Sequence, residues 1–295
     1  MRSIGEYLKI PRKIDKDAIW QEMQTRPEIT SFLAEHGEEL DPAKEKISFS
    51  ALYTFYTHLL RPDKVTSGYQ EELVVDSGAV RLSYTPTKET IDRNKKRAAD
   101  AKLILVGPPE SVRNIQLLDA DKTPPRAEAF NEILAFLDKL EKGQEARGLY
   151  LAGDFGVGKT YLLSGLANAC TAIGKTVAFV HFPSFLSELS NHFKDNTVSE
   201  KVDELKTADV LLIDDIGSES LSPWSRDDIL GSILQYRMDR KMSTFFSSNL
   251  RFPELETFLA NTKNEVNEAK AKRLMERIKF LSKEIVVGGK NYREF

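Results

Sequence analysis

The chain has 295 residues, of which 41% are hydrophobic and 29% are charged, proportions that are ordinary for a globular protein and sufficient for two domains. Its formal net charge of −3 excludes a protein that is basic over its whole surface, so any contact with nucleic acid must be local. A single cysteine, Cys170, excludes an intramolecular disulfide, and no apolar run has the length of a signal-peptide core or a membrane span, so we expect a cytoplasmic protein without a membrane segment.

The first 60 residues predict short helices. Acidic residues suited to a first helical turn begin near Asp15, and Pro27 stands at the start of a second helix that Gly37 can end. Apolar residues at helical spacing predict a third helix over 48–60.

The pattern then changes to a hairpin and a proline-rich connection. Residues 72–75 and 79–84 flank the turn 76–78 and predict two short strands. Gly and Pro residues near 107–109 and 123–125 bracket a segment that favours a linker. We therefore expect a smaller mixed α+β domain over residues 1–105, a linker over 106–125 and a second domain over 126–295.

Strands and helices alternate in the second domain. Apolar segments predict strands over 148–152, 177–182, 209–215 and 243–248. Amphipathic segments predict a helix over 127–140, before the first of these strands, and another over 224–238, between the last two. This alternation indicates an α/β fold, with a parallel sheet that carries helices on both faces.

The turn after the first of these strands fits the phosphate-loop pattern G-x-x-x-x-G-K-[ST]. Glycines there allow backbone N–H groups to converge on phosphate oxygens, and the following helix begins with its partial positive charge at the same place. We expect Lys159 to reach the β- and γ-phosphates and Thr160 to bind Mg²⁺. The residues expected to contact ATP are Gly153, Asp154, Phe155, Gly156, Val157, Gly158, Lys159, Thr160 and Tyr161.

Polar side chains follow two later strands. Asp214 and Asp215 end an apolar strand about 55 residues after the phosphate loop, where we expect Asp214 to hold Mg²⁺ and Asp215 to orient or deprotonate the attacking water. Asn249 follows the next strand, where it could sense the γ-phosphate or mark an ordinary turn.

Arginines near the end of the chain are ambiguous by themselves. Arg273 and Arg277 share one face of a basic helix at i, i+4 spacing. That face could be solvated, or one of the two arginines could enter the nucleotide site of a neighbouring subunit. Arg293, close to the end of the chain, is equally open to either interpretation.

Taken together, these motifs resemble the DnaI family of primosomal helicase loaders, which are related to DnaC and DnaA within the AAA+ class. The resemblance extends over the whole chain and is most specific from about residue 112 onward. It implies an AAA+ fold, with Asn249 as sensor 1 and Arg293 as sensor 2. It also implies that the arginine finger is Arg273 or Arg277, with Arg273 slightly preferred.

The first domain departs from the family in one respect. Related proteins often carry a zinc module there, but residues 61–87 contain no cysteine and no histidine, and only His58 lies nearby. Because a structural zinc site needs about four nitrogen or sulfur ligands, we expect no zinc and a hairpin held by apolar packing.

A single-stranded DNA contact is implied for the segment 183–194. Phe185 could stack on a base, although a core position is the alternative, and Lys194 could contact a phosphate.

The sequence and the resemblance together predict an ATP- and Mg²⁺-dependent helicase loader. We expect its first domain to bind a replicative DnaB-type hexameric helicase, on which the protein self-associates and delivers the helicase onto single-stranded DNA. Weak ATP hydrolysis would act as a switch. The main alternative is an IstB-like transposition accessory ATPase, and a DnaA-like initiator or a small-molecule kinase is a more distant one.

Overall fold

A computed structural model of the chain describes residues 16–61, 67–108, 110–191 and 197–293. The chain forms two compact units, Met1–Asn94 and Lys95–Phe295, and the division falls within helix α4 (Lys88–Asp100). Among the described helices, none combines the length and apolar composition that a bilayer crossing requires.

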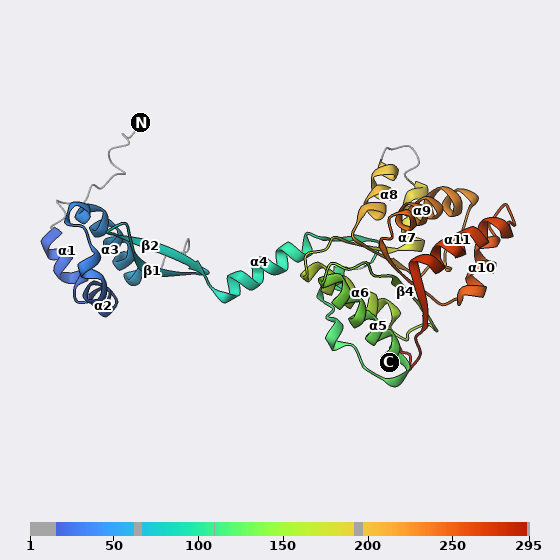
Figure 1. The fold of residues 1–295 in the computed structure, drawn as a ribbon, viewed down its shortest axis with the longest axis horizontal. Coiled ribbons are helices and arrows are strands. Elements are labelled where there is room, and N and C mark those ends of the chain that lie inside the picture. Colours follow the sequence, from blue (N-terminus) through green and yellow to red (C-terminus); the bar gives the residue numbers. More distant parts are fainter. Residues whose placement is uncertain (1–15, 62–66, 109, 192–196, 294–295) are drawn as a thin grey trace, which may run out of the picture. The chain divides into compact units, whose positions relative to one another are not determined.

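In its described residues, the first unit consists of helices and a β-hairpin (Figure 1). Its further elements are α1 (Lys16–Met23), α2 (Pro27–His36), α3 (Glu45–Leu60), β1 (Tyr69–Asp76) and β2 (Ala79–Pro86). Asp76 pairs with Ala79, and Ser77 and Gly78 both have positive φ angles, which defines a two-residue turn of the type that matches strand twist. Val80 is fully buried against α3, where its N–H donates to Ser48 Oγ. The expected hairpin and its apolar packing are confirmed.

The second unit is built on a six-stranded parallel sheet with the order β3-β5-β6-β7-β4-β8. Its strands are β3 (Leu103–Val106), β4 (Gly148–Ala152), β5 (Val177–His181), β6 (Val210–Asp214), β7 (Ser243–Ser248) and β8 (Ser282–Val286).

Helices cover both faces of this sheet (Figure 1). Along β6, Leu211 and Ile213 enter one core and Val210 and Leu212 enter the other, as the alternation of a strand buried on both faces requires. The helices are α5 (Pro124–Glu141), α6 (Lys159–Ala172), α7 (Phe182–Asn191), α8 (Thr197–Thr207), the π-helical segment η7 (Ser225–Leu230), α9 (Gly231–Asp239), α10 (Phe252–Ala260) and α11 (Glu268–Leu281). The expected α/β fold with a parallel sheet is confirmed.

The segment 103–125 packs within the second unit. β3, which the sequence placed at the end of the first domain, pairs with β5 at one edge of the large sheet. The short 3₁₀ segments η5 (Glu110–Asn114) and η6 (Leu117–Asp119) lie against α6, and Asn168 on that helix donates to the backbone carbonyls of Val112 and Ile115, both at 2.7 Å. The expected linker region is therefore tied to the phosphate-loop helix.

Candidate functional site

Four neighbouring strands place polar groups at the carboxyl-terminal end of the sheet. β5, β6, β7 and β4 are consecutive in the sheet, and their carboxyl ends lead into His181, Asp214, Asn249 and the phosphate loop 153–158. In open parallel sheets, ligands bind in the crevice outside the carboxyl ends of the strands. The cavity lined by these groups measures ≈ 560 Å³, a size that suits a small ligand.

The phosphate loop has the backbone conformation that its glycines permit. Gly156 and Gly158 have φ angles of 78° and 90°, in the left-handed region that side chains disfavour, and Gly158 stands at the start of α6. A Cβ on Gly156 would lie 1.7 Å from Oδ1 of Asn291, and the N–H of Tyr292 donates to the carbonyl of Gly156 at 3.0 Å. The last described residues of the chain thus pack directly against the loop.

Side chains of the loop divide between core and cavity. Val157 is buried in the core, whereas Phe155 is 66% exposed and lines the cavity together with the half-buried Tyr161. Gly153 and Asp154 face Lys159 with their backbone carbonyls.

Lys159 is held inside the site by three acceptors. Its Nζ donates to the carbonyls of Gly153 and Asp154 at 2.7 and 2.8 Å and to Oδ1 of Asn249 at 2.8 Å. Burial lowers the pKa of Lys159, and the nearby charges of Asp215 and Asp214 oppose that shift. The predicted lysine and the predicted sensor therefore meet in one hydrogen bond.

Asp214 and Thr160 form an oxygen cluster that fits a magnesium ion. Thr160 Oγ1 donates to Asp214 Oδ1 at 3.0 Å, and Ser247 Oγ donates to the same carboxylate. Burial raises the pKa of Asp214, while the hydrogen bonds from Ser247 and Thr160 favour its charged form. Mg²⁺ in nucleotide sites usually takes one or two protein oxygens and completes its shell with phosphate oxygens and water, which this donor set allows.

Asp215 is fixed by contacts from several elements. Its φ of 61° turns the chain sharply after β6, a conformation that costs energy for a residue other than glycine. Oδ2 accepts a hydrogen bond from Ser218 Oγ at 2.8 Å, and Oδ1 accepts one from Asn249 Nδ2 at 3.3 Å. Nε2 of His181 lies 3.8 Å from Oδ2. Asp215 is thus held in place at the mouth of the cavity.

His181, Ser218 and Ser247 are site residues that sequence reasoning missed. His181 is the last residue of β5, so its place at a strand end was a usable signal. The two serines stand in turn and strand segments with no pattern of their own.

The predicted arginines separate into two groups. Arg293 lines the cavity, and its charge contributes to the lowered pKa of Lys159. Arg273 and Arg277 on α11 do not line this cavity. The Nη1 of Arg277 donates to the carbonyl of Gly231 at 2.9 Å, whereas Arg273 is exposed and makes one weak contact, at 3.4 Å, with the carbonyl of Ala269.

The two residues expected to contact DNA have different outcomes. Phe185 is fully buried in the core beside Phe182, with ring centroids 6.4 Å apart, so the expectation that its ring stacks on a base is not met in this structure. Apolar packing of α7 against the sheet accounts for its position. Lys194 lies outside the described residues.

Sequence comparison now places this geometry in a family. The family described as IstB-like ATP binding protein matches residues 80–294, and the one described as primosomal protein DnaI N-terminus matches residues 1–84. The replicative helicase loader DnaI of Bacillus subtilis (strain 168) is 34% identical over 278 residues, which cover 90% of this chain and 89% of that protein. The chain belongs to the DnaI family of helicase loaders.

Solved structures agree with this assignment. A crystal structure of DnaI is 36% identical to the chain, covers 66% of it and 99% of the solved chain, and has a TM-score of 0.57. A putative primosome component from Streptococcus pyogenes serotype M3 is 38% identical, covers 66% of this chain and 98% of its own, and has a TM-score of 0.56. The DnaI-family chain has an AAA+ ATP-binding fold, as its motifs predicted.

In the N-terminal unit of this DnaI-family chain, His58, the histidine near the segment 61–87, makes an internal contact. Nδ1 of His58 on α3 lies 2.9 Å from both carboxylate oxygens of Glu71 on β1. Across the described residues, no group of three or more His, Cys, Asp or Glu side chains is arranged to hold a metal ion. Residues 62–66 lie outside that description, so the lack of zinc stays a prediction.

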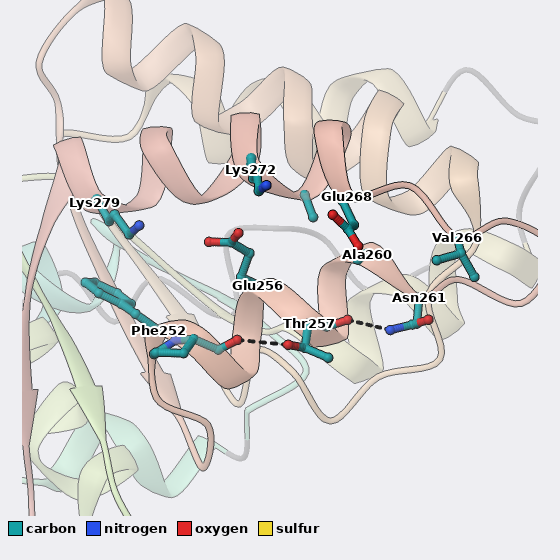
Figure 2. Close-up of a pocket in the computed structure, with 11 residues that line it drawn as sticks. Phe252, Glu256, Thr257, Ala260, Asn261, Val266, Glu268, Lys272 and Lys279 are labelled. Carbon is teal, nitrogen blue, oxygen red and sulfur yellow. Dashed lines mark hydrogen bonds between the residues drawn. The ribbon is translucent and has the colours of Figure 1, made fainter.

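A second hollow lies between α10 and α11 and is separate from the nucleotide cavity. Figure 2 shows Phe252 and Glu256 on α10 facing Lys272 and Lys279 on α11. None of the residues predicted to bind nucleotide lines this hollow. The site at the strand ends is therefore where the motifs of the DnaI family converge.

Proposed function

We propose that this chain binds ATP with Mg²⁺ in the cytoplasm and uses its nucleotide state to load a replicative hexameric helicase onto single-stranded DNA. One observation carries the proposal: a cavity lined by a phosphate-loop lysine and threonine, two acids and an asparagine lies in the same chain as a region that matches the DnaI N-terminus. The relative from Bacillus subtilis is named a replicative helicase loader.

The geometry supports a role for each polar group in ATP hydrolysis. Lys159, freed from the loop carbonyls, would contact the β- and γ-phosphates, and Thr160 and Asp214 would hold Mg²⁺, which when bound neutralises charge on the phosphates. Asp215 would orient or deprotonate the attacking water, since its carboxylate is fixed beside Asn249. Asn249 would act as sensor 1.

Sensor 2 and the finger come from the last part of the chain. Arg293 reaches the cavity of its own chain, which supports a contact with the bound phosphates in cis. Arg273 is exposed on α11, which supports its use as a finger in the site of a neighbouring subunit. Such an arrangement makes hydrolysis dependent on assembly, so that weak turnover serves as a switch.

The first unit would bind the helicase. Its core is made of its own residues, with Met23, Ile29 and Leu52 fully or almost fully buried, which gives a small folded module for recognition. The match of residues 1–84 to the DnaI N-terminus supports this assignment. Lys194 is retained as a proposed contact with single-stranded DNA.

Helicase capture tests the proposal. The full chain, with ATP and Mg²⁺, should retain a DnaB-type helicase on an affinity resin, whereas a variant lacking residues 1–94 should not. A melting curve of the shortened variant controls for its folding. Failure of the full chain to bind helicase in any nucleotide state would overturn the loader function.

The match of residues 80–294 to IstB-like proteins supports one alternative function, that of a transposition accessory ATPase. The match of residues 1–84 to the DnaI N-terminus favours the loader. Capture of a transposase in place of the helicase would reverse that preference.

A further inference from the structure

Three arginine side chains are almost fully buried in the described part of the second unit, and they differ in how their charge is compensated. Arg226 makes ion pairs with Asp227 at 2.7 Å and Glu265 at 2.8 Å. Arg237 donates to a ring of backbone carbonyls, including those of Ala208 at 2.8 Å and Ser243 at 2.7 Å. A buried guanidinium needs such partners because it carries five N–H donors and a full positive charge.

Arg126 has no equivalent set of ion-pair partners or carbonyl acceptors among the described residues. It is 3% exposed, at the start of α5, and its Nε is buried without a hydrogen-bond partner among the described residues. Within the described residues, its side chain makes one hydrogen bond, from Nη1 to the phenol oxygen of Tyr292 at 3.1 Å. Among the described carboxylates, none forms an ion pair with it. The described residues therefore compensate the charge of Arg126 poorly.

The position of this charge is informative. Nη2 of Arg126 would lie 2.9 Å from a Cβ placed on Gly158, the last glycine of the phosphate loop, so the guanidinium packs against the loop backbone. The guanidinium also lies 5.1 Å from the ring centroid of Tyr292, and the amine of Lys290 lies 4.9 Å from the same centroid. Two cations on one ring beside a phosphate-binding loop produce a local excess of positive charge.

We infer that Arg126 is a further nucleotide-binding residue, held beside the phosphate loop so that the negative charge of a bound polyphosphate compensates its own. The inference rests on nucleotide binding at this loop, which is part of the proposed function. An uncompensated buried charge weakens the empty protein, and a polyanion placed next to it removes that cost. Part of the binding energy of the nucleotide thus comes from a charge for which the described residues provide no counter-ion.

Tyr292 is a positioning residue for this arrangement. Its phenol accepts the hydrogen bond from Arg126 and donates one to Oδ2 of Asp121 at 2.9 Å. Asp121 is exposed to solvent, so water screens its charge and it compensates Arg126 only weakly. Because the N–H of Tyr292 also bonds Gly156, the same residue ties Arg126 to the loop from a second side.

Two measurements test the inference. One is calorimetric titration with ATP and Mg²⁺, and the other is thermal melting of the empty and the nucleotide-saturated protein. Arg126→Met should weaken ATP affinity about 10- to 100-fold, the range expected for lost hydrogen bonds to a charged group. The empty variant should melt at the temperature of the parent or above it, because an uncompensated charge has been removed. Arg126→Lys, which keeps the charge, should retain part of the affinity.

Arg237→Met is the matched control, since that arginine is equally buried but fully bonded. It should lower the melting temperature of the empty protein and leave the ATP affinity of the folded fraction close to that of the parent. Tyr292→Phe, which removes the one hydrogen bond of Arg126 and keeps the ring, should weaken ATP binding severalfold.

ATP affinities of Arg126→Met and Tyr292→Phe within twofold of the parent would overturn the inference. A melting temperature of empty Arg126→Met that falls as far as that of Arg237→Met would also overturn it, because the role would then be structural. A parent protein that binds ATP but no helicase would refute the loader function and leave the role of Arg126 standing. A parent that binds no ATP would refute both.

Discussion

Asn249 joins the two charged groups that we propose to act on the same end of the nucleotide. Its Oδ1 accepts a hydrogen bond from Lys159 at 2.8 Å, and its Nδ2 donates to Asp215 at 3.3 Å. We expect Asn249→Ala to lower the rate of ATP hydrolysis about a hundredfold, as does loss of a fixed polar contact at a reacting centre. Nucleotide affinity should change much less, because the phosphate loop keeps its glycines and its lysine.

Steady-state hydrolysis and equilibrium binding of ATP, measured on the same preparation, separate these two effects. Ser248→Ala is a useful neighbouring control, since Ser248 Oγ bonds the carbonyl of Ile216 outside the cavity. Equal losses in binding and hydrolysis for Asn249→Ala would contradict a sensing role.

Glu219 predicts how stability depends on pH. Burial raises the pKa of this carboxyl to about 7, while backbone N–H groups, including those of Gly217 and Ser218, act in the opposite direction. The folded protein therefore keeps a proton that the unfolded chain releases above its ordinary pKa of 4.5. The free energy of unfolding should fall as the pH rises from 4.5 to about 7, by roughly 3 kcal/mol at most.

Glu219→Gln removes this titration and keeps an oxygen that can accept from the two N–H groups. Urea unfolding at pH 5 and pH 8 should show the parent losing stability relative to the variant between the two values. A difference between parent and variant that stays constant with pH would show that the carboxyl does not titrate in this range.

At the scale of elements, buried central strands were the part of the fold that sequence could predict. β6 and β7 lie between other strands, so their segments are continuously apolar or small and end at polar residues. β8 was missed because Ser282, Lys283 and Glu284 interrupt the apolar pattern at an edge of the sheet. β3 was placed in the first domain because its partner, β5, follows about 70 residues later in the chain.

The candidate site also has a part that the sequence predicts and a part that it does not. The phosphate loop and Asp214–Asp215 were predictable because their chemistry requires fixed residue types at fixed local spacing. The contacts of His181 with Asp215 and of Arg126 with Tyr292 join segments that are distant in the sequence, so no local pattern records them. Only the packed fold brings such pairs together.

Arg237 is the point at which several elements are joined. From α9, its guanidinium donates to the carbonyl of Leu205 in the last turn of α8, to that of Ala208 just after this helix, and to that of Ser243 on β7. Arg237→Met would leave these buried acceptors without a donor, at about 1–3 kcal/mol for each group. We expect the free energy of unfolding to fall by at least about 3 kcal/mol in a urea titration.

The exposed Arg240 provides the comparison for that measurement, since its contact is with the ring of Tyr236. Arg240→Met should change stability by less than about 0.5 kcal/mol. Similar losses of stability for the two variants would show that the hydrogen bonds from Arg237 to the backbone carbonyls contribute little to the free energy of unfolding.

At the scale of the whole molecule, the cavity residues and the proposed finger Arg273 lie apart within one chain. Lys159, Asp214, Asp215 and Asn249 line the cavity, whereas Arg273 stands exposed on α11 and lines no part of it. Arg277 already bonds Gly231 in its own chain, so it has less freedom to reach a neighbour. If Arg273 completes the cavity of an adjacent subunit, hydrolysis requires one intact residue from each of two chains.

Mixing two inactive variants tests this directly. Lys159→Ala removes the loop lysine and Arg273→Ala removes the proposed finger, so each protein alone should hydrolyse little ATP in the presence of helicase. In an equal mixture, roughly one interface in four would pair an intact lysine with an intact finger, and activity should return to about that fraction of the parental rate. Arg277→Ala in place of Arg273→Ala is the matched variant one turn along the same helix. Absence of any recovery with Arg273→Ala, or recovery with Arg277→Ala alone, would remove Arg273 from the proposed site.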